Sequence, residues 1–161
     1  MAEAYRFSPI HDTLTFHEAL GYIATQGMAL ATKVFGHELA VDTLTIFSHT
    51  DQEHRFLDRL VRRYGPVSSF SHGQTLYINP RPDLEVAGNH IKYLGLRAPD
   101  DPVKPQVGYV DYPVTDYNAI HAANHPRVHE ITSGRGQGLL EVRHPDFDVL
   151  GYVVREEEHN D

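Results

Sequence analysis

Residues 87–99 read AGNHIKYLGLRAP, and residues 105–111 read PQVGYVD. Both segments contain aliphatic, aromatic and β-branched residues bounded by glycine or proline, which is typical of β-strands. The residues that join them, 99–105, contain three prolines and little apolar content, so they predict a linker. We therefore expect one structural unit to end with a strand at 90–97 and another to begin with a strand at 107–114.

The region before this linker predicts a strand, a helix and three further strands. Residues 41–47 read VDTLTIF, and in such a strand Thr43, Thr45 and Phe47 share one face. The sequence TDQE at 50–53 is a capping box, which favours a helix that starts there. The strands expected after this helix cover 67–72, 75–79 and 90–97.

The same order of elements is expected after the linker. The strand at 107–114 is followed by a short helix that Thr115 caps and Pro126 ends. The first strands of the two regions begin 66 residues apart, at Val41 and Val107. The remaining strands are expected at 128–132, 139–143 and 149–155, with a turn at Gly134, Gly136 and Gly138. The predicted fold class is therefore α+β, with two βαβββ units that form an open, curved mixed sheet.

Two short helices are expected before the first unit. Thr15 is the predicted cap of the first helix, Gly27 separates the two, and Gly36 ends the second. The predicted organisation within one compact domain is a helical preface at 1–37, a first unit at 38–99, a linker at 100–106, a second unit at 107–155 and a polar tail at 156–161.

Composition excludes several classes of function. The formal net charge of −8 disfavours binding to nucleic acid, and no apolar run is long enough for a membrane span or a signal peptide. The chain has no cysteine, which rules out disulfides and thiolate metal sites and fits a cytoplasmic protein. Arginines 59, 62 and 63 form a local basic patch, which we interpret as a solvated helix face.

The two segments quoted at the start, together with the repeated order of elements, resemble the vicinal oxygen chelate superfamily of glyoxalase and dioxygenase-like proteins. The helices before the first unit resemble its YecM-like branch. The resemblance implies that each unit forms half of an open barrel. It also implies a divalent metal ion held by four side chains, one on the first and one on the last strand of each unit.

The residues at these four positions depart from the family pattern. The resemblance places Thr43, Gly95, Asp111 and Arg155 there, with Glu156 in place of Arg155 if the register differs by one. Only Asp111 is a good ligand, and a single carboxylate does not hold a catalytic divalent ion. We therefore predict a degenerate site without a metal cofactor. The alternative is a divalent metal ion bound by His90, Asp111, His129 and Glu156.

A ligand pocket is the function that the same resemblance favours. Its predicted lining is aromatic and polar: Thr43, Thr45, Phe47, Tyr93, Arg97, Tyr109, Asp111 and Arg155. The expected partner is a small organic molecule, an anionic one included, because an arginine fork suits carboxylate or phosphate. In the opposing interpretation, the tyrosines simply fill the barrel and Asp111 forms a buried ion pair with Arg155.

Twelve histidines supply a second candidate site. His121 and His125 stand four residues apart on the expected short helix, where they would share a face, and His129 follows on the next strand. A metal site there is less favoured than a wet surface, because the glutamate of the zinc-protease motif is missing.

Three functions remain open from the sequence. The first is a small-molecule-binding protein with a degenerate metal site. The second is a metal-dependent lyase, isomerase or dioxygenase of the same superfamily. The third is a scaffold that forms a homodimer through its outer strands.

Overall fold

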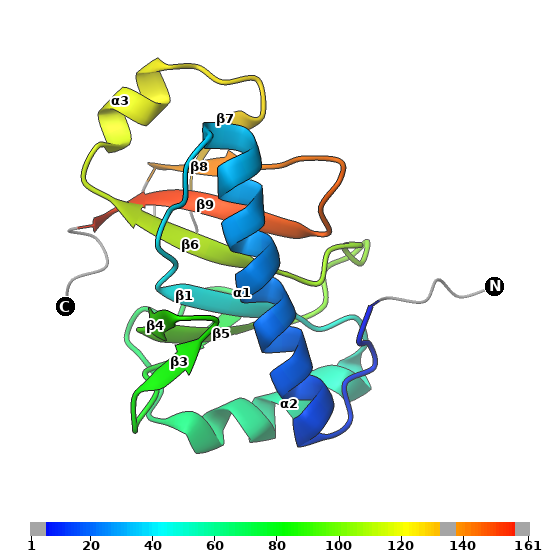
Figure 1. The fold of residues 1–161 in the computed structure, drawn as a ribbon. Coiled ribbons are helices and arrows are strands. Elements are labelled where there is room, and N and C mark those ends of the chain that lie inside the picture. Colours follow the sequence, from blue (N-terminus) through cyan, green and yellow to red (C-terminus); the bar gives the residue numbers. More distant parts are fainter. Residues whose placement is uncertain (1–5, 133–137, 157–161) are drawn as a thin grey trace.

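The computed structural model describes residues 6–132 and 138–156, and its main element is a curved mixed sheet (Figure 1). Within these ranges the sheet has seven strands, in the order β2-β5-β1-β6-β9-β8-β7. Their bounds are β1 (Thr43–Phe47), β2 (Thr75–Ile78), β5 (Tyr93–Arg97), β6 (Gly108–Val114), β7 (Val128–Thr132), β8 (Gly138–Val142) and β9 (Val149–Arg155).

The pairing of the strands divides the sheet into two related halves. In one half β1 runs parallel to β5, which pairs antiparallel with β2. In the other half β6 runs parallel to β9, which pairs antiparallel with β8. The two halves meet where β1 and β6 pair antiparallel. This arrangement confirms the predicted α+β fold with two repeated units.

Three helices surround the sheet in the described ranges. The long helix α1 (Thr13–Phe35) lies across one face of the sheet, while α2 (Asp51–Val61) and α3 (Tyr117–Ala122) lie near its two ends (Figure 1). A 3-10 turn, η1 (Arg62–Tyr64), extends α2. None of the helices in the described part of the chain is long and apolar enough to cross a membrane.

The prediction of two N-terminal helices is wrong, because α1 continues through Gly27. A Cβ atom at Gly27 would lie 2.7 Å from both methyl carbons of Val110 on β6. This glycine therefore allows the helix to approach the sheet closely. The predicted cap is also wrong: Asp12, rather than Thr15, is the N-cap, and its side chain accepts from the Thr15 amide.

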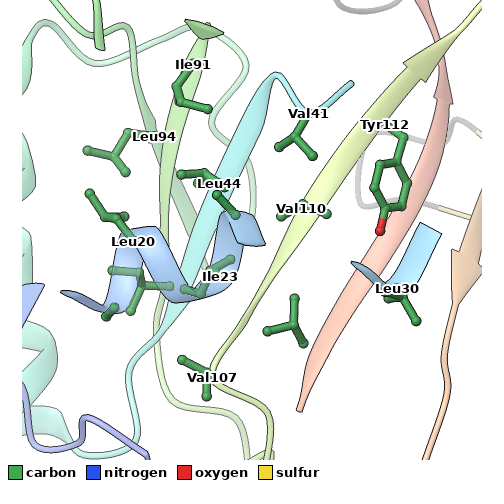
Figure 2. Packing of buried hydrophobic residues seen from close by; sticks show 14 of the residues in the cluster. Leu20, Ile23, Leu30, Val41, Leu44, Ile91, Leu94, Val107, Val110 and Tyr112 are labelled. Atoms are coloured by element: carbon green, nitrogen blue, oxygen red, sulfur yellow. The ribbon is translucent and has the colours of Figure 1, made fainter. Parts of the chain in front are cut away.

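The hydrophobic core lies between α1 and the sheet. Alternate residues of the central strands, such as Leu44 and Val110, point toward α1 and meet Leu20 and Ile23 (Figure 2). The Tyr112 side chain extends from β6 toward α1, and its hydroxyl donates a hydrogen bond to the backbone carbonyl of Gly27. Because this face is filled, any site on the sheet must lie on the opposite face, which we call the inner face.

The first unit departs from the prediction in two places. Residues 67–72 do not form a strand, since only Val67 and His72 make isolated bridges. The strand expected at 90–97 is divided at Lys92, and β4 (Asn89–Ile91) forms a separate two-stranded sheet with β3 (Leu84–Val86). The turn between them has positive φ angles at Ala87 and Gly88, and the sequence pattern does not predict this turn.

The second unit follows the prediction more closely. The strands β6, β7, β8 and β9 lie within one residue of their predicted bounds. Helix α3 begins after Asp116, whereas Thr115 was the expected cap. Of the predicted glycine turn, Gly134 and Gly136 lie outside the described residues, and Gly138 is the first residue of β8. Of the predicted polar tail, only Glu156 is described, and it is exposed.

Candidate ligand site on the inner face

Seven of the eight residues predicted to line a pocket share the inner face. Strand pairing places Thr43 beside Tyr93 and Asp111, and Thr45 beside Tyr109. The remaining two, Phe47 and Arg97, pair with each other at the ends of β1 and β5. Directly paired residues point to the same side of a sheet, so these side chains form one surface.

The two halves bring different residues to equivalent positions on this face. In the first half Thr45 pairs with Gly95, which pairs with Tyr77 on β2. In the second half Asp111 pairs with Tyr152, which pairs with Glu141 on β8. The row Thr45, Gly95, Tyr77 in the first half therefore corresponds to the row Asp111, Tyr152, Glu141 in the second half.

Two tyrosine hydroxyls meet at the middle of the inner face. The hydroxyl oxygens of Tyr77 and Tyr109 lie 2.5 Å apart and form a hydrogen bond. The hydroxyl of Thr45 is buried beside them, close enough to lower the pKa values of both phenols. Among the described residues, however, this hydroxyl has no hydrogen-bond partner of good geometry. A bound group or a water molecule would complete the hydrogen bonding of this hydroxyl.

The tyrosines are held in their neutral form. Burial raises the pKa values of Tyr77 and Tyr109, and the nearby carboxylate of Asp111 raises them further. The same two causes act on Tyr152, together with the Glu141 carboxylate, which raises the pKa of this phenol more than Asp111 does. At neutral pH the inner face therefore offers hydroxyl groups that both donate and accept hydrogen bonds.

Aromatic rings surround the hydroxyl pair. The Phe70 ring stacks on Tyr93, with ring centroids 4.9 Å apart, and also contacts Tyr77 at 5.0 Å. On the other side Tyr109 meets Phe47 at 5.6 Å and Tyr152 at 4.9 Å. Part of the opposing interpretation is therefore correct, since these tyrosines are packed as a core is packed.

Partly exposed charged groups lie at the rim of the inner face. The Arg97 guanidinium forms a two-point ion pair with Asp100, at 2.8 and 3.1 Å. The Tyr152 hydroxyl donates to Glu141 at 3.1 Å, and Glu141 also accepts from Arg143 at 2.5 Å. The rim therefore contains both signs of charge, while the buried carboxylate beneath it is that of Asp111.

Arg155, the eighth predicted residue, does not lie on the inner face. In the register of β6 and β9 it pairs with Val114, whereas Asp111 pairs with Tyr152, three residues earlier. Because side chains alternate along a strand, Arg155 points to the opposite face from Tyr152. Its guanidinium lies 3.9 Å above the ring of Tyr117 on α3, so the predicted pair between Asp111 and Arg155 is wrong.

The residues on the inner face do not fit the metal site that the resemblance implies. Strand register places Thr45 and Gly95 of the first half at the positions that Asp111 and Tyr152 occupy in the second half. Asp111 is the one strong metal ligand among them. A side chain at Gly95 has no room either, because a Cβ atom there would lie 2.3 Å from the Thr45 hydroxyl oxygen.

The alternative metal set is not brought together. His90 lies on β4 in the separate two-stranded sheet and approaches Asp83 at 3.6 Å, whereas Asp111 is buried on β6. His129 on β7 and Glu156 after β9 are both exposed. Across 6–132 and 138–156, no three histidine or carboxylate side chains are grouped so that they would hold a metal ion.

The histidines near α3 have separate roles. His121 approaches Glu130 of β7, with 3.3 Å between Nε2 and Oε2. The helix ends at Ala122, so His125 lies beyond it and does not share its face; the Nδ1 atom of His125 accepts from the Arg127 amide. His129 lines a shallow hollow beside His121.

Three inner-face residues were missed from the sequence: Tyr77, Glu141 and Tyr152. Tyr77 and Tyr152 lie within strands that the sequence did predict, so their alternation with neighbouring apolar residues was available as a signal. Glu141 lies in a predicted strand as well. Their place beside Asp111 and Thr45 depends on strand register, which the sequence leaves open.

Comparisons with known proteins define the fold. No family model matches the chain, and no curated protein matches its sequence. A solved structure described as "Structural Genomics, Protein EC4020" matches with a TM-score of 0.65 at 16% sequence identity, and covers 99% of this chain and 96% of that one. The chain therefore shares the fold of that protein along nearly its whole length.

Two other solved structures match over a smaller part of the chain. Streptomyces coelicolor methylmalonyl-CoA epimerase in complex with 2-nitronate-propionyl-CoA matches with a TM-score of 0.42 at 15% identity, over 73% of this chain and 98% of that one. A glyoxalase/bleomycin resistance protein/dioxygenase superfamily member from Vibrio splendidus 12B01 gives 0.39 at 12% identity, over 71% and 97%.

Proposed function

We propose that the inner face binds a small organic molecule without a resident metal ion, as a degenerate member of the vicinal oxygen chelate superfamily. The observation that carries this proposal is the Thr45 hydroxyl, which is buried beside the Tyr77–Tyr109 pair and has no partner of good geometry among the described residues. A ligand atom that bonds to this hydroxyl would satisfy it.

The charges on this face favour a ligand that carries hydrogen-bond donors. Asp111 and Glu141 are both carboxylates, and the guanidinium of Arg97 already pairs with Asp100. An anionic ligand, which the sequence suggested, would have to compete with Asp100 for Arg97. A neutral or cationic ligand avoids that competition.

A thermal-shift screen of metabolites in the presence of EDTA tests this proposal. A ligand of the inner face raises the melting temperature of the wild-type protein and loses this effect in the variant Thr45→Val, which removes one hydroxyl. The matched control is Thr32→Val, which removes an exposed hydroxyl on α1 that donates to the Met28 carbonyl, away from the inner face. Stabilisation of wild type and both variants to the same extent would contradict the proposal.

The metal-dependent enzyme is the weaker alternative, because the four equivalent positions hold one strong ligand, Asp111, and the carboxylate of Glu141 is bonded to Arg143 and Tyr152. We also propose a cytoplasmic location, on the absence of cysteine, and the YecM-like branch, on the helix that precedes the first unit. The homodimer remains a prediction that light scattering of the purified protein would test.

A further inference from the structure

A hollow of about 340 Å³ lies between the start of α1 and the outer side of α2, away from the inner face. Its lining combines basic, polar and apolar side chains: His11, Asp12, Thr13, Phe56, Arg59, Leu60 and Arg63. The size is within the range of small-molecule sites.

The arginines near this hollow differ in their bonding. Arg62 donates to Asp58, with 2.7 Å between Nε and Oδ1. Arg59 and Arg63 line the hollow, and neither makes a hydrogen bond or ion pair with any residue in 6–132 or 138–156. The basic patch is therefore not uniformly a solvated face, since two of its three arginines line a hollow.

The one carboxylate in the hollow is already engaged. Oδ1 of Asp12 accepts from the Thr15 amide at 2.7 Å, and Oδ2 lies 3.7 Å from Nε2 of His11. Asp12 also sits at the N-terminus of α1, where the helix dipole compensates negative charge. The two arginines therefore outweigh it as the charges that an incoming group would meet.

The floor of the hollow is apolar. Leu60 is buried and Phe56 is half-buried, and both stand one turn from an arginine on α2 or η1. An apolar floor beside unbonded guanidinium groups suits a ligand with one charged end and one apolar part.

We propose that this hollow binds a small organic oxyanion, in which a phosphate or carboxylate group is joined to an aromatic or other apolar group. The two arginines bind the oxyanion, and Phe56 and Leu60 contact the apolar part. Because the whole chain has a net charge of −8, such binding requires this local site and is not a general property of the surface.

An NMR titration of the ¹⁵N-labelled protein with phenyl phosphate tests the proposal. Saturable shifts are expected at the amides of Thr13 and Phe56, with a Kd of about 1 mM or lower. Benzoate distinguishes a carboxylate from a phosphate ligand, and inorganic phosphate shows what the apolar group adds. Benzyl alcohol, which lacks the charge, is expected not to bind.

Three sets of variants make the test specific. The double variant Arg59→Gln and Arg63→Gln should weaken binding by about tenfold or more, whereas Arg62→Gln, which removes one positive charge next to the site, should change it by less than about twofold. Asp12→Asn preserves the helix cap and should tighten binding by a few-fold, since it removes a negative charge. No saturable shift with either anion, equal binding of benzyl alcohol, or equal weakening by Arg62→Gln would overturn the proposal.

Discussion

Thr45 and Asp111 occupy equivalent positions in the two halves of the sheet. Thr45 pairs with Tyr109 of the other half and with Gly95 of its own, while Asp111 pairs with Thr43 and Tyr152. They are 66 residues apart, the same spacing as that of the predicted first strands. One repeat position therefore holds a carboxylate in one half and a buried hydroxyl in the other.

This difference predicts opposite effects of two similar substitutions on stability. Thr45→Val removes a buried hydroxyl that has no partner of good geometry in residues 6–132 and 138–156, so the free energy of unfolding should stay equal or rise by about 0.5–1 kcal/mol. Thr43→Val removes a buried hydroxyl that donates to Asp42 at 3.0 Å, and should lower it by about 1 kcal/mol. Urea unfolding of both variants measures the difference, and a larger loss for Thr45→Val would contradict the assignment.

The carboxylate of Asp111 should be detectable through the tyrosines around it. Burial raises the pKa values of Tyr77 and Tyr109, and the Asp111 charge contributes to the shift. Removal of this charge in Asp111→Asn should lower both pKa values, so phenolate absorbance should appear at lower pH than in wild type. Asp146→Asn, on an exposed loop, is the control and should leave the titration unchanged.

Close packing of α1 on the sheet can be tested at two glycines of the same helix. Gly27→Ala places a methyl group 2.7 Å from the Val110 side chain and should destabilise the protein by about 1–3 kcal/mol. At Gly21 a Cβ atom would meet no atom within 4 Å, so Gly21→Ala should stabilise by about 0.5–1 kcal/mol. Thermal unfolding of both variants is the measurement, and the same sign for both would contradict this packing.

Glu53 should make stability depend on pH. Its buried carboxylate accepts from Ser8 Oγ and the Ile10 amide, both at 2.6 Å, and from the His49 amide at 2.7 Å. Burial alone would raise the pKa of Glu53, but these hydrogen bonds and the His49 side chain lower it below its ordinary value of 4.5. A lowered pKa in the folded state means that this stabilisation is complete above pH 4.5 and is lost as the pH falls through the lower folded value.

Glu53→Gln should therefore lose about 3 kcal/mol of stability at neutral pH and much less in acid. Urea unfolding between pH 7 and pH 3 measures both effects. Glu85→Gln on the exposed strand β3 is the matched control and should change stability by less than about 0.5 kcal/mol. An equal loss for Glu53→Gln at all pH values would show that packing, rather than charge, is responsible.

The sequence predicted the fold well because element order is a local property. The capping box at 50–53 marks the start of α2, where Thr50 accepts from the Glu53 amide at 3.0 Å. Gly27 was misinterpreted because a glycine that breaks a helix and one that packs against a sheet look identical in sequence. The β3–β4 hairpin was missed because Ala87 gives no sign of its positive φ angle.

The candidate site was only partly predictable. The period-two alternation placed Thr43, Thr45, Tyr109 and Asp111 on one face, as the structure does. Arg155 was placed on the wrong face because the pairing of β9 with β6 is fixed by contacts distant in sequence. The same missing register hid Tyr152 and Glu141, which complete the row beside Asp111.

Titration of the purified, untagged protein with zinc, nickel and manganese in a calorimeter tests the central claim most directly. Asp111 is the one strong ligand at the four equivalent positions, and the other carboxylate of the inner face, Glu141, is bonded to Arg143 and Tyr152, so we expect no submicromolar 1:1 binding that depends on Asp111. Weaker binding to exposed histidines would be unchanged in Asp111→Ala. Submicromolar 1:1 binding that Asp111→Ala abolishes would contradict the account of a site without a metal ion.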